Sequence, residues 1–250
     1  MNAAPVALVT GGARGIGAAA ALRLAADGYH VAIACREAKS HARETLAALE
    51  KQTEAVLLEG DLADPDVPQR LVDGTVEAFG GLDALVNNAG NVVVGGLEDA
   101  DADAFDRQFA VNARAPFLLC KAALPHLARS AQEGRTAAIV NVSSLNGSRV
   151  PSFGAPLYSA SKAALNMLTV ALAPSLAEHG VRINAVEPGA TETEMFLANA
   201  NDEARAHFID RAAMGRLGKP DEVATVIAFL LSADAGWMTG EVVSASGGTR

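Results

Sequence analysis

The chain has 250 residues, of which half are apolar and a fifth are charged, so it can bury a sizeable core. Its 29 acidic and 20 basic residues give a net charge of −9, and the absence of any basic block argues against nucleic-acid binding as its main task. No apolar run is long enough to span a bilayer and no charged leader precedes the first one, so we expect a cytoplasmic protein without a membrane partner.

Short apolar runs alternate with alanine-rich helical stretches along the whole chain. This alternation predicts an α/β fold with a parallel sheet, and no linker divides residues 1–250 into two domains. The predicted strands are 6–10, 29–34, 55–59, 84–86, 137–142, 181–186 and 241–245. A first helix is predicted to end at residue 27, and later ones to span 37–51, 64–79, 101–128, 158–178 and 220–231. Residues 190–212 carry few strand signals, and we expect them to form a mobile helical lid.

A glycine-rich turn follows the first predicted strand and precedes a helix. Gly11 suits a tight turn. Gly15 and Gly17 would let a pyrophosphate and the strand approach a helix N-terminus, whose free amides and dipole attract anions. An ordinary strand-to-helix turn is the alternative interpretation. Because the strand and the helix are both in place, the pattern favours nucleotide binding.

The second predicted strand ends at Cys35 and Arg36, without the acidic side chain that binds an adenosine 2′-hydroxyl. Arg36 and Arg14 would instead offer planar forks of hydrogen-bond donors to a 2′-phosphate. The alternative is that both are solvated surface arginines. Since the acid is also missing, the sequence favours NADP over NAD.

Tyr158 and Lys162 stand four residues apart, and Ser144 follows the fifth predicted strand. On a helix, this spacing puts the phenol and the ammonium on one face. A fixed positive neighbour favours the phenolate and lowers the pKa of a tyrosine, which makes the side chain a usable general acid or base. A solvated helix face is the alternative interpretation of the Tyr-x-x-x-Lys spacing alone.

Residues that oppose regular helix occur in two predicted helices. Asn112 and Pro116 lie within 101–128, so we expect a bend near Asn112. Pro174 lies within 158–178 and is expected to kink that helix.

Cysteines and histidines show no pattern typical of a metal site. The two cysteines do not make a disulfide framework, and neither has a second ligand at suitable spacing. The five histidines are scattered through helix ends and loops. We therefore expect core thiols and no metal ion.

Six signatures, in this order along residues 5–248, resemble the short-chain dehydrogenase/reductase family. They are the turn Thr10-Gly11-x-x-x-Gly15-x-Gly17, the run Asn87-Asn88-Ala89-Gly90, Asn112, Ser144, Tyr158 with Lys162, and Pro188-Gly189 followed by Thr193. The resemblance implies a single doubly wound (Rossmann) domain, with a seven-stranded parallel sheet and helices on both faces. It also implies assembly into a homotetramer or homodimer.

By the same resemblance, four side chains have catalytic roles. Tyr158 would donate a proton to a carbonyl oxygen as the nicotinamide hydride attacks the carbon, or accept it in the oxidative direction. Ser144 would hydrogen-bond that oxygen. Lys162 would hold the nicotinamide ribose and lower the tyrosine pKa, and Asn112 would anchor a water that leads protons to the lysine.

The resemblance further implies a cofactor site along the edge of the sheet. Asp61 and the Leu62 backbone would meet the adenine. The other implied cofactor residues are Gly11, Arg14, Gly15, Ile16, Gly17, Arg36, Asn88, Ala89, Gly90, Tyr158, Lys162, Pro188, Gly189, Thr191 and Thr193. Three serines stand beside catalytic positions and are interpreted as structural, namely Ser143, Ser159 and Ser161.

Three residues depart from the family pattern. Pro174 puts the oligomeric state in question, because the helix that contains it packs across a dimer interface in the family. Glu187 precedes Pro188 where a small neutral residue is common, and we expect it to face water rather than to repel an anionic substrate. Ser246 stands where an aspartate is usual, and nothing in the sequence explains it.

The resulting hypothesis is an NADP(H)-dependent oxidoreductase that interconverts a ketone or aldehyde and an alcohol. The alternatives are a 3-oxoacyl carrier-protein reductase and an NAD-linked sugar or alcohol dehydrogenase. A non-catalytic nucleotide-binding scaffold is disfavoured because all four catalytic positions are present. The predicted substrate wall is mostly apolar, with no arginine or lysine between Thr191 and Asn201, which favours an uncharged carbonyl. It comprises residues 92–97, Leu145, Phe153, Leu157, Met195 and Phe196.

Overall fold

A parallel sheet runs through the computed structural model, which describes residues 4–149 and 154–249. Its seven strands follow the order β3-β2-β1-β4-β5-β6-β7. They are β1 (Val6–Thr10), β2 (His30–Cys35), β3 (Ala55–Glu59), β4 (Ala84–Asn87), β5 (Ala138–Val142), β6 (Arg182–Pro188) and β7 (Val242–Ala245). The inner strands β1, β4 and β5 are buried along their whole length, as expected for apolar runs covered on both faces. The strand order reverses between β1 and β4, where parallel sheets open a crevice at their carboxyl edge.

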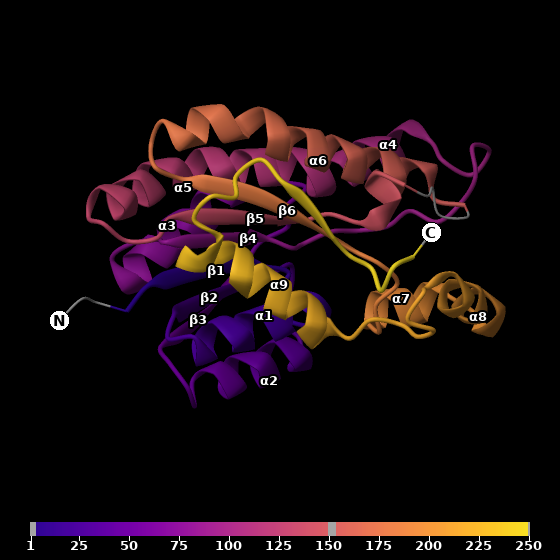
Figure 1. The fold of residues 1–250 in the computed structure, drawn as a ribbon, viewed down its shortest axis with the longest axis horizontal. Helices are drawn as coiled ribbons and strands as arrows, with labels where there is room; N and C mark the ends of the chain where they lie inside the picture. The colour runs from indigo at the N-terminus through magenta and orange to yellow at the C-terminus, as the bar shows by residue number, and fades with distance from the viewer. Residues whose placement is uncertain (1–3, 150–153, 250) are drawn as a thin grey trace.

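Helices cover both faces of this sheet, in two layers (Figure 1). One layer contains α1 (Gly15–Ala26), α2 (Ser40–Leu49) and α9 (Pro220–Leu231). The other contains α3 (Val67–Phe79), α5 (Ala115–Gln132) and α6 (Pro156–Ala177). Each layer packs its apolar side chains against the sheet in a hydrophobic cluster of its own. The doubly wound arrangement implied by the sequence is therefore confirmed.

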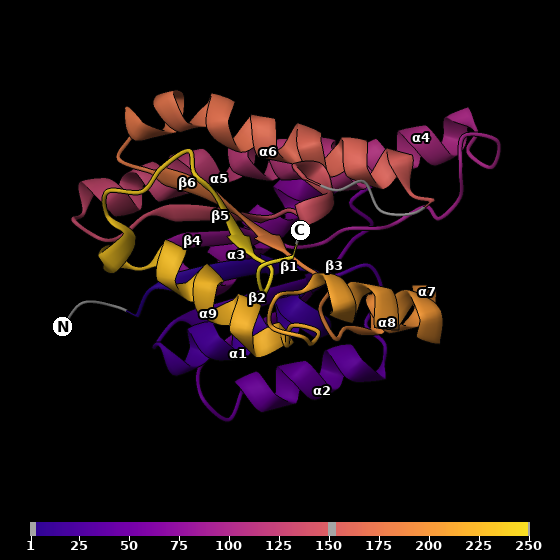
Figure 2. The same cartoon turned by 45° about the vertical axis from the view of Figure 1, so that its right-hand side comes forward.

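Two short helices project beyond the carboxyl edge of the sheet (Figure 2). They are α7 (Glu194–Asn199) and α8 (Asp202–Arg211), and they fall within the predicted lid. No residue of α8 is buried, so few apolar contacts hold this helix in place. The helical content predicted for residues 190–212 is confirmed, while their mobility stays a prediction.

The predicted helix 101–128 is divided into three parts. The segment α4 (Ala102–Phe109) leads into a π-helical turn, η1 (Ala110–Arg114), and α5 follows. Asn112 lies in the π-helical turn, and Pro116, which has no amide to donate to the preceding turn, lies in the first turn of α5. The helix type thus changes at Asn112, and the bend expected there stays a prediction.

The start of one predicted helix needs correction. The helix predicted from residue 64 begins at Val67, because the Asp64 carboxylate accepts the Asp66 amide and forms a turn first. Pro174 lies in the last turn of α6, which is continuous from Pro156 to Ala177. The kink expected at Pro174 stays a prediction.

Within residues 4–149 and 154–249, no helix is long and apolar enough to cross a membrane. In the same residues, no three histidine, cysteine or acidic side chains form a group that could hold a metal ion.

Candidate active site

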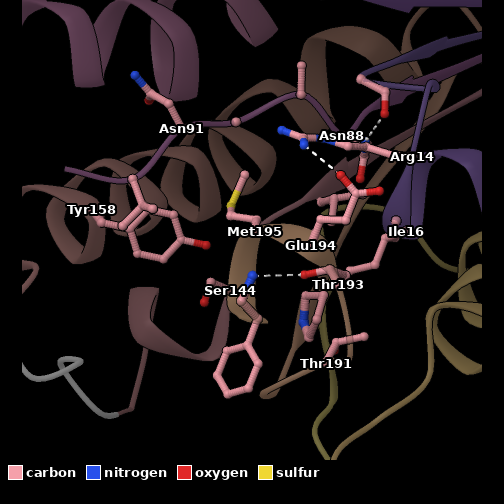
Figure 3. Close-up of a pocket in the computed structure, with 18 of the residues that line it drawn as sticks. Arg14, Ile16, Asn88, Asn91, Ser144, Tyr158, Thr191, Thr193, Glu194 and Met195 are labelled. Atoms are coloured by element: carbon pink, nitrogen blue, oxygen red, sulfur yellow. Dashed lines mark hydrogen bonds and ion pairs between the residues drawn. The ribbon is translucent and has the colours of Figure 1, made fainter. Parts of the chain in front are cut away.

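A cavity of about 1010 Å³ opens at the carboxyl edge of the sheet. Its lining is formed by the glycine turn, the ends of β2, β4, β5 and β6, the start of α6, and the helices α7 and α8. Figure 3 shows Tyr158 and Ser144 on one side of it and Arg14 and Glu194 on the other. Every site residue predicted from the sequence lines this cavity except Gly17 and Asn112.

The glycine turn leaves the N-terminus of α1 open to an anion. Gly11 has a positive φ of 62°, and a Cβ there would lie 2.9 Å from the Ala89 Cα. Arg14 precedes the helix without capping it through its side chain, and the first turn of α1 contains no acidic residue. The free amides and the helix dipole therefore favour a diphosphate at this point. The residues present fit a dinucleotide cofactor.

Gly17 and Asn88 hold the turn together from behind. A Cβ on Gly17 would lie 2.2 Å from the Gly11 carbonyl oxygen, so this glycine serves the packing of the helix on the turn. The Asn88 amide donates to the carbonyl oxygens of Thr10 and Gly11, at 2.9 and 3.1 Å. Its side chain is thus committed to the protein backbone, although the residue also lines the cavity.

Charged side chains surround the end of the cavity nearest β2. Arg14 forms an ion pair with Glu194 of the lid at 2.7 Å, and Arg36 lies 3.6 Å from Glu37. Both arginines are more than half exposed, so their donors remain accessible from solvent. Lys39 and His41, which were not predicted as site residues from the sequence, also line the cavity here. Their place just after the second strand is the signal that could have identified them.

Asp61 also lines the cavity, but its carboxylate already has partners. The Ala63 amide donates to it at 3.0 Å, and the Arg107 guanidinium lies 3.0 Å away. The Ala63 hydrogen bond, with a smaller contribution from Arg107, keeps the pKa of this carboxyl below its usual value. The neighbouring Leu62 is almost fully buried at the cavity wall.

The three predicted catalytic side chains that line the cavity come from two elements. Ser144 begins the 3₁₀ turn η2 (Leu145–Gly147) directly after β5, and its Oγ accepts the Asn146 amide at 3.2 Å. Tyr158 and Lys162 lie one turn apart near the start of α6. The Lys162 Nζ is 5.8 Å from the centroid of the Tyr158 ring and donates to the Val142 carbonyl oxygen at 2.8 Å.

The pKa of Tyr158 is shifted in the direction opposite to the predicted one. Burial raises the pKa of Tyr158, and a hydrogen bond with Ser144 only partly offsets this increase. Burial also lowers the pKa of Lys162 from 10.5 to about 8, because its side chain is only 3% exposed. The phenol therefore stays protonated at neutral pH, which is the state that a proton donor needs.

Asn112 lies behind the cavity rather than in its wall. Its Oδ1 accepts the Asn91 amide at 3.0 Å, and its Nδ2 donates to the Asn91 carbonyl oxygen and to the Ser161 hydroxyl at 2.9 and 3.0 Å. A Cβ on Gly90 would lie 3.4 Å from both Asn112 Oδ1 and Lys162 Nζ. The glycine therefore keeps the space between the asparagine and the lysine open.

The neighbours of Asn112 include residues that the sequence analysis did not use. Ser161 donates to the Tyr158 carbonyl oxygen, so it links the tyrosine helix to Asn112. Gln108, four residues before Asn112, binds the Asn91 carbonyl oxygen and the Val93 amide. A glutamine four residues before Asn112 on a predicted helix is the sequence signal that could have identified Gln108 as its neighbour. Ser143 donates to the Lys162 carbonyl oxygen, in keeping with its structural interpretation.

Known proteins share these features over almost the whole chain. The family model described as enoyl-(acyl carrier protein) reductase matches residues 11–250. The short-chain dehydrogenase/reductase FrzI of a Cladobotryum species is 37% identical over 250 residues, covering 97% of this chain and 94% of FrzI. The protein belongs to the short-chain dehydrogenase/reductase family.

Two other family members have a nicotinamide cofactor in their names. A short-chain dehydrogenase from Burkholderia cenocepacia, solved in complex with NADP, is 40% identical with a TM-score of 0.90, and the match covers 98% of this chain and 97% of that one. The L-rhamnose 1-dehydrogenase (NAD(P)(+)) of a Sphingomonas species is 33% identical over 243 residues, covering 96% of this chain and 94% of that enzyme.

The substrate side of this dehydrogenase/reductase site is more polar than predicted. Five of the expected apolar residues line the cavity: Val92, Val94, Leu145, Met195 and Phe196. Leu97 is 90% exposed, Leu157 does not line the cavity, and Phe153 lies outside the described residues. The helix α8 adds Glu203, His207 and Arg211, which sequence reasoning missed because the lid contains no recognised signature. The prediction of a mostly apolar wall omitted these charged side chains because it extended only to Asn201.

The expectation that Glu187 faces water is also wrong. This side chain, near the end of β6, is 2% exposed and accepts hydrogen bonds from three polar side chains. It is buried because its strand position points beneath α6 rather than toward solvent. Ser246 lies directly against Gly189, whose Cβ position would be 2.9 Å from the Ser246 Cα.

Proposed function

We propose that this protein is an NADP(H)-dependent oxidoreductase that interconverts a ketone or aldehyde and an alcohol. The observation that carries the proposal is the meeting of Ser144, Tyr158 and Lys162 in one cavity with the open N-terminus of α1. An acid–base tyrosine and an anion-binding helix end are the two parts that nicotinamide-dependent carbonyl reduction requires of a protein.

Different parts of the cavity would hold different parts of the cofactor. The diphosphate fits the turn at Gly11, Gly15 and Ile16, and the 2′-phosphate fits beside Arg14 and Arg36. The adenine would lie at Asp61 and Leu62, with the run from Asn88 to Gly90 along the ribose and diphosphate. Pro188, Gly189, Thr191 and Thr193 would border the nicotinamide. The Burkholderia relative solved in complex with NADP supports the choice of this cofactor.

When bound, the nicotinamide supplies or accepts the hydride at the substrate carbon. In the reductive direction, Tyr158 gives its phenolic proton to the carbonyl oxygen, and Ser144 donates a hydrogen bond to the same oxygen. The phenolate that remains is stabilised by the Lys162 ammonium on the same face of α6. Asn112, fixed beside Lys162 across Gly90, would anchor the water through which the proton is replaced. In oxidation each proton moves in the opposite direction.

The substrate we propose is a moderately hydrophobic carbonyl compound, because Val92, Val94 and Phe196 face the cavity. Two specific observations favour other substrates. The relative named L-rhamnose 1-dehydrogenase (NAD(P)(+)) favours a sugar dehydrogenase. The acyl carrier protein in the family description favours an acyl substrate linked to a carrier protein, of which a 3-oxoacyl thioester is the kind that a carbonyl reductase would take. Arg211 in the lid is a cation that an anionic carrier-linked substrate would meet.

We also propose that the protein assembles as a homotetramer or homodimer. Apolar side chains on α5 and α6 are exposed in the single chain, with Phe117 at 41%, Val170 at 45% and Met167 at 65%. Figure 1 shows these two helices side by side, in the layer that also contains α3. Light scattering coupled to gel filtration tests this proposal, and a monomeric mass at micromolar concentration would reject it.

The activity is tested by following NADPH oxidation with ketones, sugars and 3-oxoacyl thioesters. With the best substrate, Tyr158→Phe is expected to lower kcat at least about 100-fold, because the phenyl ring has no proton to donate. NADPH binding by the variant should persist. Tyr29→Phe is the matched control, since Tyr29 is the other of the two tyrosines and does not line the cavity. Unchanged turnover by Tyr158→Phe rejects the mechanism, and no turnover with any class supports a non-catalytic scaffold.

A further inference from the structure

Glu187 is a buried acid without an ion pair in the described part of the chain. It directly precedes Pro188 and Gly189, which line the cavity, but it does not line the cavity itself. Removing a carboxylate from water without a cation is costly unless hydrogen bonds replace the lost hydration. The hydrogen bonds of the Glu187 side chain therefore indicate which segments of the chain it joins.

Three neutral donors from three different elements bind the Glu187 carboxylate. Asn166 Nδ2 of α6 donates to Oε1 at 2.6 Å. The hydroxyls of Ser148 and Ser244 donate to Oε2 at 2.8 and 3.2 Å. Ser148 follows the η2 turn, and Ser244 lies in β7. A carboxylate accepts several hydrogen bonds and donates none, so this set of donors matches its ionised form.

Two of these donors connect Glu187 to the catalytic residues. Ser148 ends the short turn that Ser144 begins, and Asn166 lies one helical turn after Lys162. The turn rests directly on the helix, because a Cβ on Gly147 would lie 2.8 Å from the Lys162 carbonyl carbon. Glu187 thus joins the end of the Ser144 turn to the helix that carries Tyr158.

We propose that Glu187 is a positioning residue, which clamps the Ser144 turn onto α6 and so fixes the Ser144 hydroxyl relative to the Tyr158 hydroxyl. It acts through Ser148 and Asn166 and does not contact the reacting atoms. The inference rests on the proposed function, in which both hydroxyls bind one carbonyl oxygen. Such an arrangement is sensitive to displacement, since a shift of about 1 Å in a catalytic group costs up to about 100-fold in rate.

The sharpest test removes only the link to the turn. Ser148 is exposed, so Ser148→Ala should leave the unfolding temperature almost unchanged. We expect kcat to fall by about tenfold while the Kd for NADPH stays the same, because the turn moves but the cofactor site does not. Ser244→Ala is the matched control. It deletes an equivalent hydroxyl from the same carboxylate oxygen, but on β7, and its kcat should stay near that of the wild type.

Variants of Glu187 itself provide the second test. Glu187→Ala should lower kcat at least as much as Ser148→Ala, and the double variant should show little further loss. Glu187→Gln should recover most of the kcat. Its amide keeps one acceptor and can donate to Asn166 Oδ1, a buried atom that has no partner among the described residues. If Glu187→Ala does not fold, Ser148→Ala and Glu187→Gln still decide whether Glu187 positions the Ser144 turn.

Equal kcat values for Ser148→Ala, Ser244→Ala and the wild type would overturn the proposal, even if Glu187→Ala lowered the unfolding temperature. A Glu187→Gln variant as inactive as Glu187→Ala would also overturn it. Tyr158→Phe is measured in the same series. If that variant keeps full turnover, the proposed function fails. If it loses turnover while Ser148→Ala does not, only the role of Glu187 fails.

Discussion

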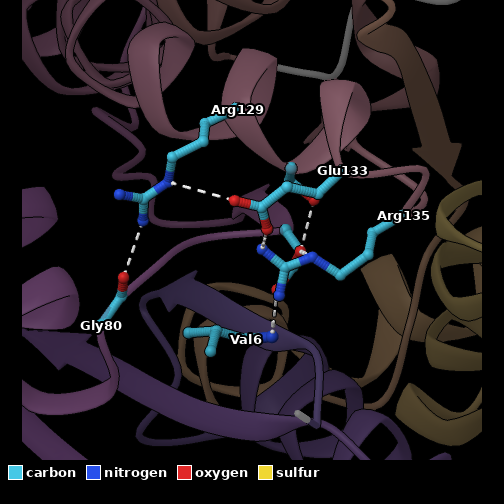
Figure 4. Close-up of polar contacts among 7 residues, drawn as sticks. Val6, Gly80, Arg129, Glu133 and Arg135 are labelled. Carbon is cyan, nitrogen blue, oxygen red and sulfur yellow. Dashed lines mark hydrogen bonds and ion pairs between the residues drawn. The ribbon is translucent and has the colours of Figure 1, made fainter. Parts of the chain in front are cut away.

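Two buried charged side chains, Asp83 at the amino edge of the sheet and Lys162 at the carboxyl edge, differ in how their charges are compensated. At the amino edge, Asp83 is fully buried, accepts the Val6 amide at 2.7 Å and the Ser130 hydroxyl, and lies 3.2 Å from Arg135. Figure 4 shows Val6 and Arg135 close together at this edge, with Glu133 and Arg129 beside them. At the carboxyl edge, Lys162 is 3% exposed and has one hydrogen bond among those described, to a carbonyl oxygen.

The difference separates a charge that supports the fold from one that has a chemical role only in the proposed function. The donors around Asp83 replace its hydration and join β1 to the end of α5, so the charge is compensated in the folded chain. Lys162 has no acidic partner in the described residues, and burial lowers its pKa to about 8. An uncompensated buried cation costs stability, which is expected at a site reserved for a ligand.

The largest effect on stability is expected at the amino edge. Asp83→Ala leaves the Val6 amide and the Ser130 hydroxyl without their acceptor and Arg135 without its buried partner. The free energy of unfolding should fall by about 3–5 kcal/mol. Urea denaturation measures this, with Asp27→Ala as the control, because the exposed Asp27 pair with Arg23 should contribute under about 1 kcal/mol. A loss below about 1 kcal/mol at Asp83 would remove the contrast between the two edges.

At the carboxyl edge, a substitution is expected to increase the free energy of unfolding. Lys162→Met removes a buried ammonium whose pKa is lowered from 10.5 to about 8, a shift that corresponds to roughly 3 kcal/mol. Below pH 8 the lysine is charged in both states and the whole cost is present. The cost diminishes as pH rises from 8 to 10.5, because only the unfolded chain then still binds the proton.

Lys162→Met should therefore be more stable than the wild type at pH 7, equally stable above about pH 10.5, and inactive. Denaturation curves across this pH range check the prediction. Lys121→Met, at an exposed lysine of α5, should show no such pH-dependent gain. A Lys162→Met variant that is less stable at pH 7 would show that the ammonium is compensated after all.

A third prediction concerns cations that solvent still reaches. We expect NADPH to bind at least about tenfold more tightly than NADH, because Arg14 and Arg36 add charge-assisted hydrogen bonds to the 2′-phosphate. Arg36→Ala should weaken NADPH binding by about tenfold and leave NADH binding unchanged, as measured by cofactor fluorescence titration. Arg70→Ala, at an exposed arginine outside the cavity lining, is the control. A preference for NADH by the wild type contradicts the role of both arginines.

The smallest effect is expected from the ion pair between the glycine turn and the lid. Glu194→Gln frees Arg14 from its 2.7 Å partner, and an exposed pair is worth about 0.2–1 kcal/mol. NADPH affinity should therefore rise about two- to fivefold in calorimetric titration. Glu192→Gln, an exposed neighbour outside the cavity lining, should change nothing. Weaker binding by Glu194→Gln would indicate that Glu194 assists the cofactor rather than competing with it.

Much of the fold could be predicted because its signals are local. The run Val6–Thr10 has the predicted bounds, and the other six strands agree to within two residues at each end. The first turn of α3 was misplaced, since an aspartate turn such as that at Asp64 resembles a helix start in sequence. The cavity gathers all but Gly17 and Asn112 of the predicted site residues, because glycine turns and strand ends occupy fixed places in a parallel sheet.

The sequence by itself determined the order of strands and helices, the glycine turn and the spacing of Tyr158 and Lys162, since these depend on residues close together in the chain. Only the tertiary structure decided the burial of Glu187, the pairing of Arg14 with Glu194 and the raised pKa of Tyr158. Hydrogen bonding and desolvation depend on which distant segments meet. The donors to Glu187 come from residues 148, 166 and 244, and no local pattern relates these positions to one another.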